Sequence, residues 1–507
     1  MREKLYGGAS AVKPVRPGTR RPGREIWQGA RAWSIMPARP EPRGATEENG
    51  MTQDRGHWGS RLGFILAAAG SAVGLGNLWK FPYLAWENDG GVFVLSYLVA
   101  VALFGLPIMI AEFMLGRRAQ ANPVVAFARL GNRAWSGVGW LGVTAAAVIL
   151  SYYTVIAGWS LKLFVQCLGW SFGGYPAAGA ADFGRFLADG WQQLLLALLF
   201  SGLTAFIVYK GVGSGIERGS KIMMPALALI LLYILITALV LPEAGAGLAH
   251  LFVPKISSFR AEMILEGLGQ AFFSLSLGLG AMIAYGSYLK KDVSLPRAAL
   301  SVTLLDTGMA VVAGIIMFSI IHSIPGMRDQ VSASSIGMLF VTLPKLFYTQ
   351  MPGGALLGPL FFVLLAFAAL TSTISLLEVL VSLLVDRQGM TRPRATLLSA
   401  GAVFLGSCLS ALSLGAVSWL SSFSLFSGKP GVLATLDHLA ANWMLPLGGL
   451  FTTVFVGWFL GRDAARDELG AGGRGALFAV WLWLIRVVCP LGILALLLAI
   501  AMGKDFS

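Results

Sequence analysis

Long apolar stretches recur along nearly the whole chain, and they constrain its fold more than any other feature of the sequence. Each is long enough to cross about 30 Å of lipid hydrocarbon as a helix. Only 12% of the residues are charged, against about 25% in a soluble domain. The pattern predicts a polytopic membrane protein and excludes a soluble enzyme, a nucleic-acid-binding domain and a disulfide-stapled secreted module. The eleven stretches fall at residues 61–86, 91–116, 136–168, 191–209, 219–241, 262–289, 296–323, 355–385, 395–413, 433–460 and 476–502.

Positive charge is divided unevenly between the two sides that these segments define. The loops after the even-numbered segments carry sixteen Lys and Arg residues, and the opposite loops carry six. Short cytoplasmic loops are enriched in Lys and Arg, so we predict a multi-pass protein of the cell (inner) membrane with a cytoplasmic N-terminus. Eleven crossings then place Ser507 outside. Residues 1–50 hold ten Lys and Arg against five Asp and Glu, contain no apolar run, and are predicted to be disordered.

Glycines interrupt the first and sixth segments at mid-membrane. The first contains Gly70, Gly74 and Gly76, and the sixth contains Gly278 and Gly280. Glycine weakens a helix by about 1 kcal/mol relative to alanine, so both segments should unwind there. Exposed backbone at that depth is tolerated only where it lines a protein cavity. Paired interruptions five segments apart indicate an inverted repeat with a binding site between its halves.

The expected organisation follows from this repeat. We predict a disordered basic extension over residues 1–50, a first five-helix repeat over 51–241, a second over 242–461, and an eleventh helix with the C-terminus over 462–507.

Patterns typical of enzymes and metal sites do not fit their context here. The run 169–173 matches the G-x-S-x-G nucleophile pattern, which needs a strand-to-helix turn, but it stands at the end of an apolar segment. The four histidines lack zinc-ligand spacing, and Cys167, Cys408 and Cys489 lie in apolar segments. We expect neither an enzyme nor a cofactor.

Four short motifs carry a specific resemblance. They are AVGLGNLWKFPY at 72–83, GQAFFSLSLG at 269–278, LTST at 370–373 and the spacing of Gly215 from Pro225. These motifs resemble the first-, sixth-, eighth- and fifth-helix signatures of the neurotransmitter:sodium symporter family, and the similarity runs from about Arg55 to Arg486. The resemblance implies an all-α integral membrane protein with the leucine-transporter fold, in which a 5+5 inverted repeat is followed by an eleventh transmembrane helix.

Two sodium sites are implied by the resemblance, with sodium as the coupling ion. Sodium is a hard cation that prefers oxygen ligands, and unwound helices expose carbonyl oxygens. Site 1 would use the carbonyl or side-chain oxygens of Ala72, Asn77, Ser274 and Asp306. Site 2 would use the carbonyls of Gly70, Val73 and Ala368 with the hydroxyls of Thr371 and Ser372. The alternative for those two hydroxyls is bonding to carbonyls of their own helix.

An amino-acid substrate would lie between the broken segments. Its carboxylate would meet the Leu75 and Gly76 amides at a half-helix N-terminus, where the dipole favours anions, and the Tyr153 hydroxyl. No acidic residue faces the expected side-chain pocket, which favours an apolar L-amino acid over a monoamine or a cationic amino acid. The preference between aliphatic and aromatic side chains stays open. Compared with the residues that the resemblance implies at the same positions, Ile149 is larger and Leu279 is smaller, so the two differences oppose each other in volume. The predicted substrate-binding residues are Ala72, Leu75, Gly76, Ile149, Tyr153, Phe273, Ser274, Ser276, Leu279, Ser372 and Leu376.

Residues at both ends of this pocket match the gates of the family. Lys80 and Asp437 match the outer charged pair, with Lys in place of the common Arg, which gives up bidentate geometry. The residues that match the inner network are Arg55, Trp58, Ser287, Tyr288 and Asp386. We expect a structural role for the intramembrane carboxylate Glu112, whereas the sequence indicates no role for Glu378, which replaces a family Gln.

Asp306 is the clearest departure from the family, most members of which have Asn there. Chloride-independent members supply a carboxylate one turn later on the seventh helix, where this chain has Ala310. Two sodium ions and one substrate carboxylate leave a positive excess, and unit charges about 4 Å apart interact by roughly 4 kcal/mol at an effective dielectric of 20. Asp306 can neutralise that excess, so we predict transport without chloride. A protonated or helix-capping Asp306, or a proton-coupled one, is the alternative.

The sequence therefore predicts a sodium-coupled secondary active symporter of a hydrophobic L-amino acid that works by alternating access. Segments one, two, six and seven would rock against segments three, four, eight and nine. A non-transporting amino-acid sensor on the same fold and an ion channel are the alternatives. The expected partners are the amino acid, sodium and the lipid bilayer, with no nucleic acid, and the sequence does not specify an oligomeric state.

Overall fold

The computed structural model describes residues 56–506 except 177–182, 325–326, 328–334 and 470–474. The described residues belong to one compact unit. The predicted disorder of residues 1–50 therefore lies outside the described part of the chain. Within that part, the regular structure is helical and no strand occurs.

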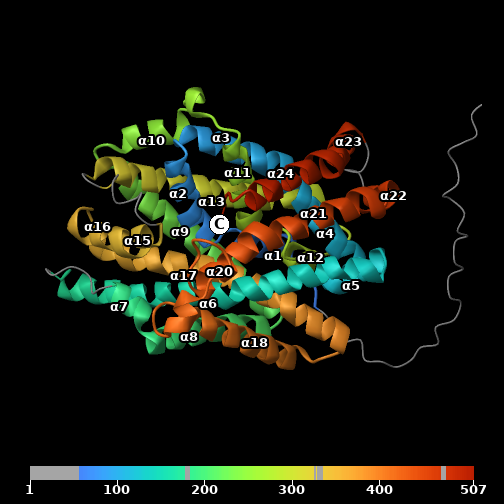
Figure 1. The fold of residues 1–507 in the computed structure, drawn as a ribbon, viewed down its shortest axis with the longest axis horizontal. Helices are drawn as coiled ribbons and strands as arrows, with labels where there is room; N and C mark the ends of the chain where they lie inside the picture. The colour runs from blue at the N-terminus through green and yellow to red at the C-terminus, as the bar shows by residue number, and fades with distance from the viewer. Residues whose placement is uncertain (1–55, 177–182, 325–326, 328–334, 470–474, 507) are drawn as a thin grey trace, which may run out of the picture. The chain divides into compact units, whose positions relative to one another are not determined.

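The helices follow one another closely along the chain (Figure 1), with η marking 3-10 and π-helical turns. Up to residue 239 they are α1 (Arg61–Ala72), η1 (Gly76–Lys80), α2 (Phe81–Glu87), α3 (Gly91–Ala100), η2 (Val101–Gly105), α4 (Leu106–Ala119), α5 (Pro123–Leu130), η3 (Arg133–Trp135), α6 (Ser136–Gly173), α7 (Phe183–Ala188), α8 (Gly190–Tyr209), η4 (Val212–Glu217) and α9 (Arg218–Leu239). Beyond it they are α10 (Ala244–Phe252), η5 (Ile256–Ser258), α11 (Glu262–Ser274), α12 (Ala281–Gly286), α13 (Leu295–Ser323), α15 (Ser335–Gly337), η6 (Met338–Thr342), α16 (Leu343–Thr349), α17 (Gly354–Gln388), α18 (Arg392–Leu412), α19 (Ser418–Ser422), α20 (Val432–His438), η7 (Leu439–Met444), α21 (Leu445–Val454), η8 (Phe455–Phe459), α22 (Arg462–Leu469), α23 (Ala476–Trp483), η10 (Leu484–Val488) and α24 (Cys489–Ala501).

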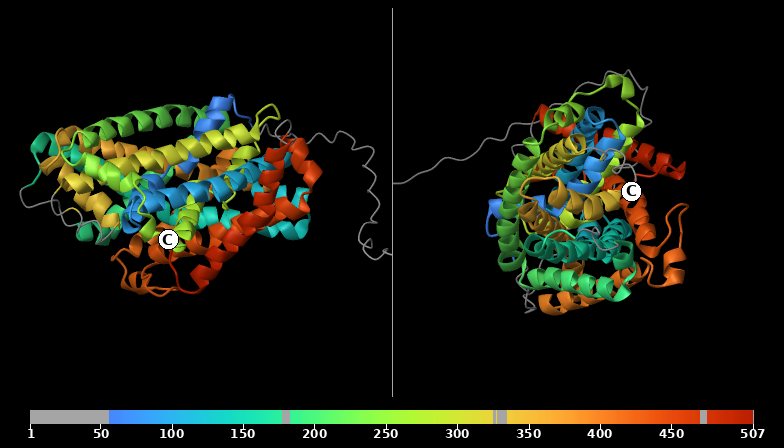
Figure 2. Two further views of the ribbon diagram at one scale, coloured as in Figure 1. Left: turned by 90° about the horizontal axis from the view of Figure 1, so that it is seen from above. Right: turned by 90° about the vertical axis from the view of Figure 1, so that its left-hand side faces the viewer.

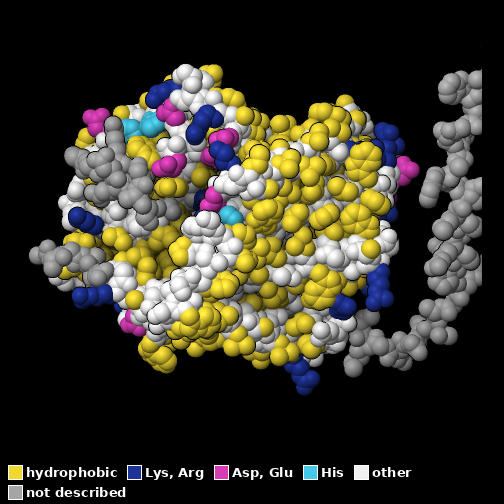
Figure 3. Space-filling model, in the orientation of Figure 1, with side chains coloured by type: hydrophobic (Ala, Val, Ile, Leu, Met, Phe, Trp, Pro, Cys, Tyr) yellow, Lys and Arg dark blue, Asp and Glu magenta, His cyan; other side chains and the backbone are white. Residues whose placement is uncertain are grey.

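All eleven predicted segments coincide with helical stretches. In the described part of the chain, nine continuous stretches are long and apolar enough to cross a membrane. The first segment makes a tenth if its two halves, Arg61–Ala72 and Gly76–Glu87, which are bent by 53°, count as one span. The sixth segment is divided into α11 and α12, which are separately too short to count as spans. On the face shown in Figure 3, a broad hydrophobic area separates Lys and Arg side chains at the right-hand end from charged side chains nearer the left-hand end.

The longest helices form the centre of the bundle. Helices α6 and α17 pack along each other, and 78% of the most apolar window of each is buried, against 33% for α8. The right-hand view of Figure 2 looks along this bundle, so that most long helices are seen end-on. Small residues allow close helix approach where lipid gives little hydrophobic driving force. A Cβ at Gly158 of α6, for example, would lie 3.0 Å from the Leu196 backbone of α8.

The sixth segment unwinds where the sequence predicts. Residues 275–280 separate α11 from α12. Gly278 and Gly280 both have φ of +80°, a conformation that only glycine adopts without strain. Ser276 also has a positive φ, of +54°, and its Oγ donates to the Ser71 carbonyl at 2.8 Å. The break in the first segment is shorter than predicted, since α1 continues through Ala72 and only residues 73–75 interrupt it.

Candidate functional site

The two broken segments meet at the centre of the bundle. Val73, with ψ of 102°, is extended and ends α1. Two amides that follow it are bound by side chains: Gly74 N–H donates to Asn77 Oδ1 at 3.2 Å, and Leu75 N–H donates to Tyr153 Oη at 3.1 Å. The break therefore places backbone amides beside the tyrosine that the sequence assigns to a substrate carboxylate.

Three predicted site-1 residues form one hydrogen-bonded cluster around Asp306, which is fully buried. Asn77 Nδ2 donates to Asp306 Oδ1 at 2.8 Å. Ser274 Oγ donates to Asp306 Oδ2 at 2.7 Å, and Tyr97 Oη lies 3.5 Å from the same oxygen. Gln270 Nε2 donates to the Gly76 carbonyl at 3.1 Å. The cluster joins α13 to the breaks in both the first and the sixth segments.

The predicted substrate pocket is a small cavity of about 30 Å³ beside this cluster. Of the predicted substrate-binding residues, all but Leu75 line it. Ser71, Gly74 and Leu445 line it as well and were not predicted. Leu75 instead lines a larger cavity of about 280 Å³, which Lys80 and Asp437 also line and which shares Phe273 with the small cavity. The side-chain lining of the small cavity is apolar apart from serines and Tyr153, and it contains no carboxylate.

Most predicted site-2 residues lie together where α17 faces the first break. A Cβ at Gly70 would lie 3.1 Å from Thr371 Cβ. Thr371 Oγ1 donates to the Ala368 carbonyl at 3.0 Å, and Ser372 Oγ lies 3.2 Å from it. Both hydroxyls therefore bond within their own helix, and Ser372 Oγ also lies 3.3 Å from the Ser71 carbonyl. Val73 opens the adjacent break.

The two residues predicted for the outer gate line the same cavity without pairing directly. Lys80 and Asp437 both line the 280 Å³ cavity. The ion pairs of the described residues include none between them. Lys80 Nζ instead donates to the Phe506 carbonyl at 2.8 Å and lies 5.3 Å from the centre of the Phe273 ring.

The residues predicted for the inner gate, as far as the structure describes them, lie at the opposite end of α1. Trp58 is buried, and its Nε1 donates to the Tyr285 carbonyl at 3.0 Å. Its ring meets the Tyr288 ring edge-on, with the two ring centres 6.4 Å apart. Ser287 is buried beside Tyr288, and Asp386 accepts from the Asn122 amide at 2.7 Å. Arg55, the remaining predicted member, lies outside the described residues.

Glu112 and Glu378, the two intramembrane carboxylates other than Asp306, also have partners, although the sequence indicated no role for Glu378. Glu378 is fully buried and forms an ion pair with Arg392, and it accepts from Tyr288 Oη at 2.6 Å. Glu378 is thus linked to a predicted inner-gate residue. Glu112 Oε1 accepts from the Gly278 amide at 2.7 Å, so this carboxylate holds the unwound sixth segment, in the structural role that we expect for it.

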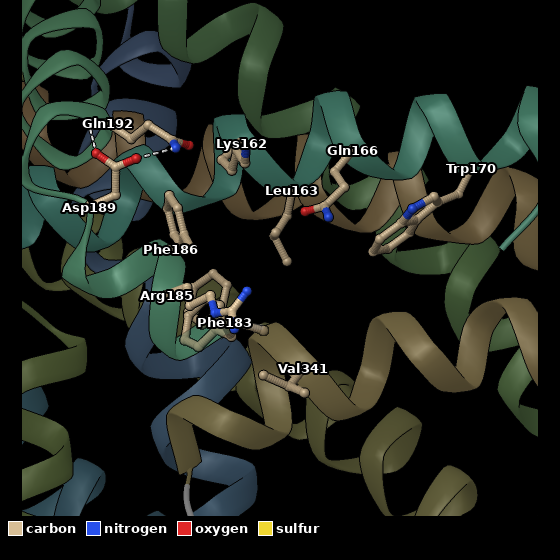
Figure 4. Close-up of a pocket in the computed structure, with 11 residues that line it drawn as sticks. Lys162, Leu163, Gln166, Trp170, Phe183, Arg185, Phe186, Asp189, Gln192 and Val341 are labelled. Carbon is tan, nitrogen blue, oxygen red and sulfur yellow. Dashed lines mark hydrogen bonds between the residues drawn. The ribbon is translucent and has the colours of Figure 1, made fainter. Parts of the chain in front are cut away.

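A further cavity of about 350 Å³ lies between α6, α7 and η6 (Figure 4). Lys162, Arg185 and Asp189 line it, and Asp189 accepts from Gln192 Nε2 at 2.5 Å. None of the predicted site residues line this cavity, so the candidate site is the smaller cavity between the broken segments.

The sequence matches the model of the sodium:neurotransmitter symporter family over residues 55–173 and 186–505. The chain belongs to this family. The uncharacterized sodium-dependent transporter YhdH of Bacillus subtilis is 36% identical over 445 residues, which are 87% of this chain and 96% of that protein. The human sodium- and chloride-dependent GABA transporter 2 is 26% identical over 494 residues, 87% of this chain and 80% of that protein.

A solved structure is also similar. The crystal structure of MhsT in complex with L-phenylalanine has a TM-score of 0.79 and 39% sequence identity, and the match covers 88% of this chain and 99% of that chain. Together these matches confirm the predicted family and the all-α leucine-transporter fold. This member of the sodium:neurotransmitter symporter family is a multi-pass membrane protein of a sodium-dependent transporter family.

Proposed function

We propose that this chain is a sodium-coupled symporter of a hydrophobic L-amino acid that does not require chloride. The observation that carries the proposal is the cluster in which Asn77 and Ser274, one from each broken segment, both bind the buried Asp306 carboxylate. A carboxylate at this place can balance a sodium ion without a bound anion. Site 1 would consist of these side chains with the Ala72 carbonyl.

The second sodium site would be formed where Gly70 touches Thr371. The carbonyls of Gly70, Val73 and Ala368 and the hydroxyls of Thr371 and Ser372 would be its ligands. Because the Thr371 and Ser372 hydroxyls donate to helix carbonyls, their oxygen lone pairs remain available to a cation.

The apolar cavity supports a hydrophobic amino acid as the substrate. Its lining has no carboxylate to pair with a second amine, whereas Gly76 and Tyr153 line it and the Leu75 amide donates to the Tyr153 hydroxyl. The similar structure MhsT holds L-phenylalanine, which is therefore the first substrate to test.

Alternating access would open this cavity to each side in turn. The 280 Å³ cavity with Lys80 and Asp437 would be the outer vestibule, which closes when the small cavity opens to the other side. Trp58, Ser287, Tyr288 and Asp386, with Arg55, would be the inner gate. In this arrangement the N-terminus is cytoplasmic and the C-terminus is outside.

The decisive experiment is uptake of radiolabelled L-phenylalanine, and of a panel of other amino acids, into proteoliposomes with and without an inward sodium gradient. We expect accumulation that needs sodium and persists when gluconate replaces chloride. Binding without accumulation would favour a sensor, and a sodium-independent flux would favour a channel. Uptake that stops in gluconate would contradict the role of Asp306.

A pair of variants tests the sodium-2 assignment in the same assay. Thr371→Ala combined with Ser372→Ala should abolish sodium-driven accumulation while the protein remains folded. Ser382→Ala is the matched control, because its hydroxyl lies on the same helix and donates to the Val379 carbonyl at 3.0 Å. Equal uptake by both variants would refute the assignment.

A further inference from the structure

The segment that follows α24, residues Gly503–Phe506, turns back toward the outer vestibule. We call it the α24 extension. Gly503 has φ of +91°, its amide donates to the Ile500 carbonyl at 2.9 Å, and the Lys504 amide donates to the Ala499 carbonyl at 3.0 Å. These two bonds form a Schellman motif, which ends a helix and reverses the chain. In Figure 1 the C label marking this end lies between α2 and α20.

One wall of the vestibule binds the extension through Asp505. Its carboxylate pairs with Lys429 Nζ at 2.5 Å and lies 3.3 Å from His438 Nδ1. Asn442 Nδ2 donates to Asp505 Oδ1 at 2.8 Å, and Asn442 Oδ1 accepts from the Phe506 amide at 3.2 Å. Asn442 is almost fully buried, and its side-chain amide binds the Asp505 carboxylate and the Phe506 backbone amide at the same time. All three partners belong to α20, η7 or the loop before them.

The opposite wall binds the same extension through different groups. Lys80 of η1 donates to the Phe506 carbonyl at 2.8 Å. Lys504 Nζ pairs with Glu262 Oε1 of α11 at 2.9 Å. The Phe506 side chain is 7% exposed, and a Cβ at Gly269 of α11 would lie 3.4 Å from its Cβ. The extension thus connects the first and sixth segments to the tenth.

These are the walls between which a substrate must pass to reach the small cavity from the outer side. Lys80, Lys429 and Asp437 all line the 280 Å³ cavity. Lys80 and Asp437 are not paired directly, and Lys80 is bound by the extension instead. If the first and sixth segments move away from the tenth when the vestibule opens, contacts to both walls cannot be kept.

We propose that the α24 extension is a latch of the outer gate, which closes the vestibule by binding both walls and must release one of them for substrate to enter. The proposal rests on the proposed function, because it assigns a step of the transport cycle. Asp505 binds the tenth-segment wall, and the Phe506 carbonyl binds Lys80. The latch supplies the connection that a direct Lys80–Asp437 pair would otherwise make.

A reversible cross-link tests the latch. In a background without Cys167, Cys408 and Cys489, the pair Gly269→Cys and Phe506→Cys places two Cβ atoms about 3.4 Å apart, close to the separation that a disulfide bridges. Oxidation should form the bond, detected by mass spectrometry, and should lower L-phenylalanine uptake by at least about tenfold until a reductant is added. Oxidation should not change the uptake of either single-cysteine variant. Absence of the cross-link, or a complete cross-link with unchanged uptake, would overturn the proposal.

A second measurement does not depend on transport and so separates the latch from the proposed function. Ala434→Cys places a thiol in the vestibule lining, and its rate of labelling by a membrane-impermeant maleimide reports how open the vestibule is. Asp505→Asn, or removal of residues 504–507, should raise this rate about tenfold, which corresponds to about 1.4 kcal/mol. Met502→Ala, at a site 78% exposed, is the matched control. If Asp505→Asn and the removal of residues 504–507 both gave the same labelling rate as Met502→Ala, the latch would be overturned, even if no amino acid is transported.

Discussion

At the scale of single residues, Asp306 is the charge on which the proposed coupling depends. We expect Asp306→Asn to raise the sodium concentration needed for half-maximal uptake by at least about tenfold, a loss of roughly 1.4 kcal/mol, because a full negative charge beside the ion is removed. Partial recovery in high chloride is expected if Tyr97, Gln270 and Ser274 can hold the anion. Uptake of radiolabelled substrate as a function of sodium concentration is the measurement. Asp467→Asn, at a side chain 72% exposed, is the control, and an unchanged sodium dependence in Asp306→Asn would contradict this role.

The ion pair of Glu378 with Arg392 gives a second prediction at this scale. Glu378 is fully buried, whereas 20% of the Arg392 side chain is exposed. Removing one partner of a buried pair leaves an uncompensated charge, at a cost of about 3–5 kcal/mol. Arg392→Ala should therefore lower the thermal unfolding midpoint more than Glu378→Gln, since Gln still accepts from Tyr288 and Arg392 reaches solvent. The double variant should recover much of the loss. A larger loss in Glu378→Gln would refute this reading.

The sequence predicted Asn77 and Ser274 because each stands in a motif that occupies one segment, and Asp306 because it differs from the Asn that most family members have there. Glu378 was different. Its partner Arg392 belongs to the next helix, beyond a turn whose φ at Gly389 is +65°. Only the packing of that turn brings the two charges together, and a resemblance to family members with Gln at the position of Glu378 gives no information about it.

At the scale of the elements, the unwound part of the sixth segment is held by close backbone contacts that a side chain would break. A Cβ at Gly278 would lie 2.2 Å from the Leu445 carbonyl oxygen, and its φ of +80° disfavours other residues. Gly278→Ala should destabilise the protein by about 1–3 kcal/mol or prevent folding. Gly308→Ala on α13, where nothing lies within 4 Å, should be neutral or slightly stabilising. Thermal unfolding of the two variants in detergent measures the difference, and equal midpoints would contradict the argument.

Hydropathy located the spanning helices to within a few residues, because about 30 Å of hydrocarbon imposes both length and composition on them. It did not find the short helices α5 and α10, which carry no such length requirement. The extent of the first break was also overestimated. Gly70 remains in α1, where its missing side chain makes room for Thr371, so this glycine serves packing and not unwinding.

At the scale of the whole molecule, the candidate sites and gates all lie from Arg55 onward. We therefore expect deletion of residues 1–50 to leave sodium-driven uptake and the thermal unfolding midpoint unchanged. Uptake per molecule inserted in proteoliposomes is the measurement, with the full-length chain as the reference. A truncated protein that inserts normally but transports nothing would show that the basic N-terminal residues take part in transport.

The contacts of the α24 extension show what the sequence could not reveal at this scale. Asp505 meets Asn442, which lies 63 residues earlier, and the Phe506 carbonyl meets Lys80, 426 residues earlier. No spacing rule connects such positions. Only the fold of all eleven segments brings the residues after α24 to Lys80 of the first segment.

This placement has a practical consequence for anyone who purifies or visualises the protein. An affinity tag or fluorescent protein fused after residue 507 would be attached directly to a segment wedged between Lys80 and Asn442. Such a fusion alters the entrance it was meant to report on, and slow uptake by the fused protein would then describe the label. A label attached at Met1 is instead separated by more than fifty residues of sequence from Arg55, the first residue assigned here.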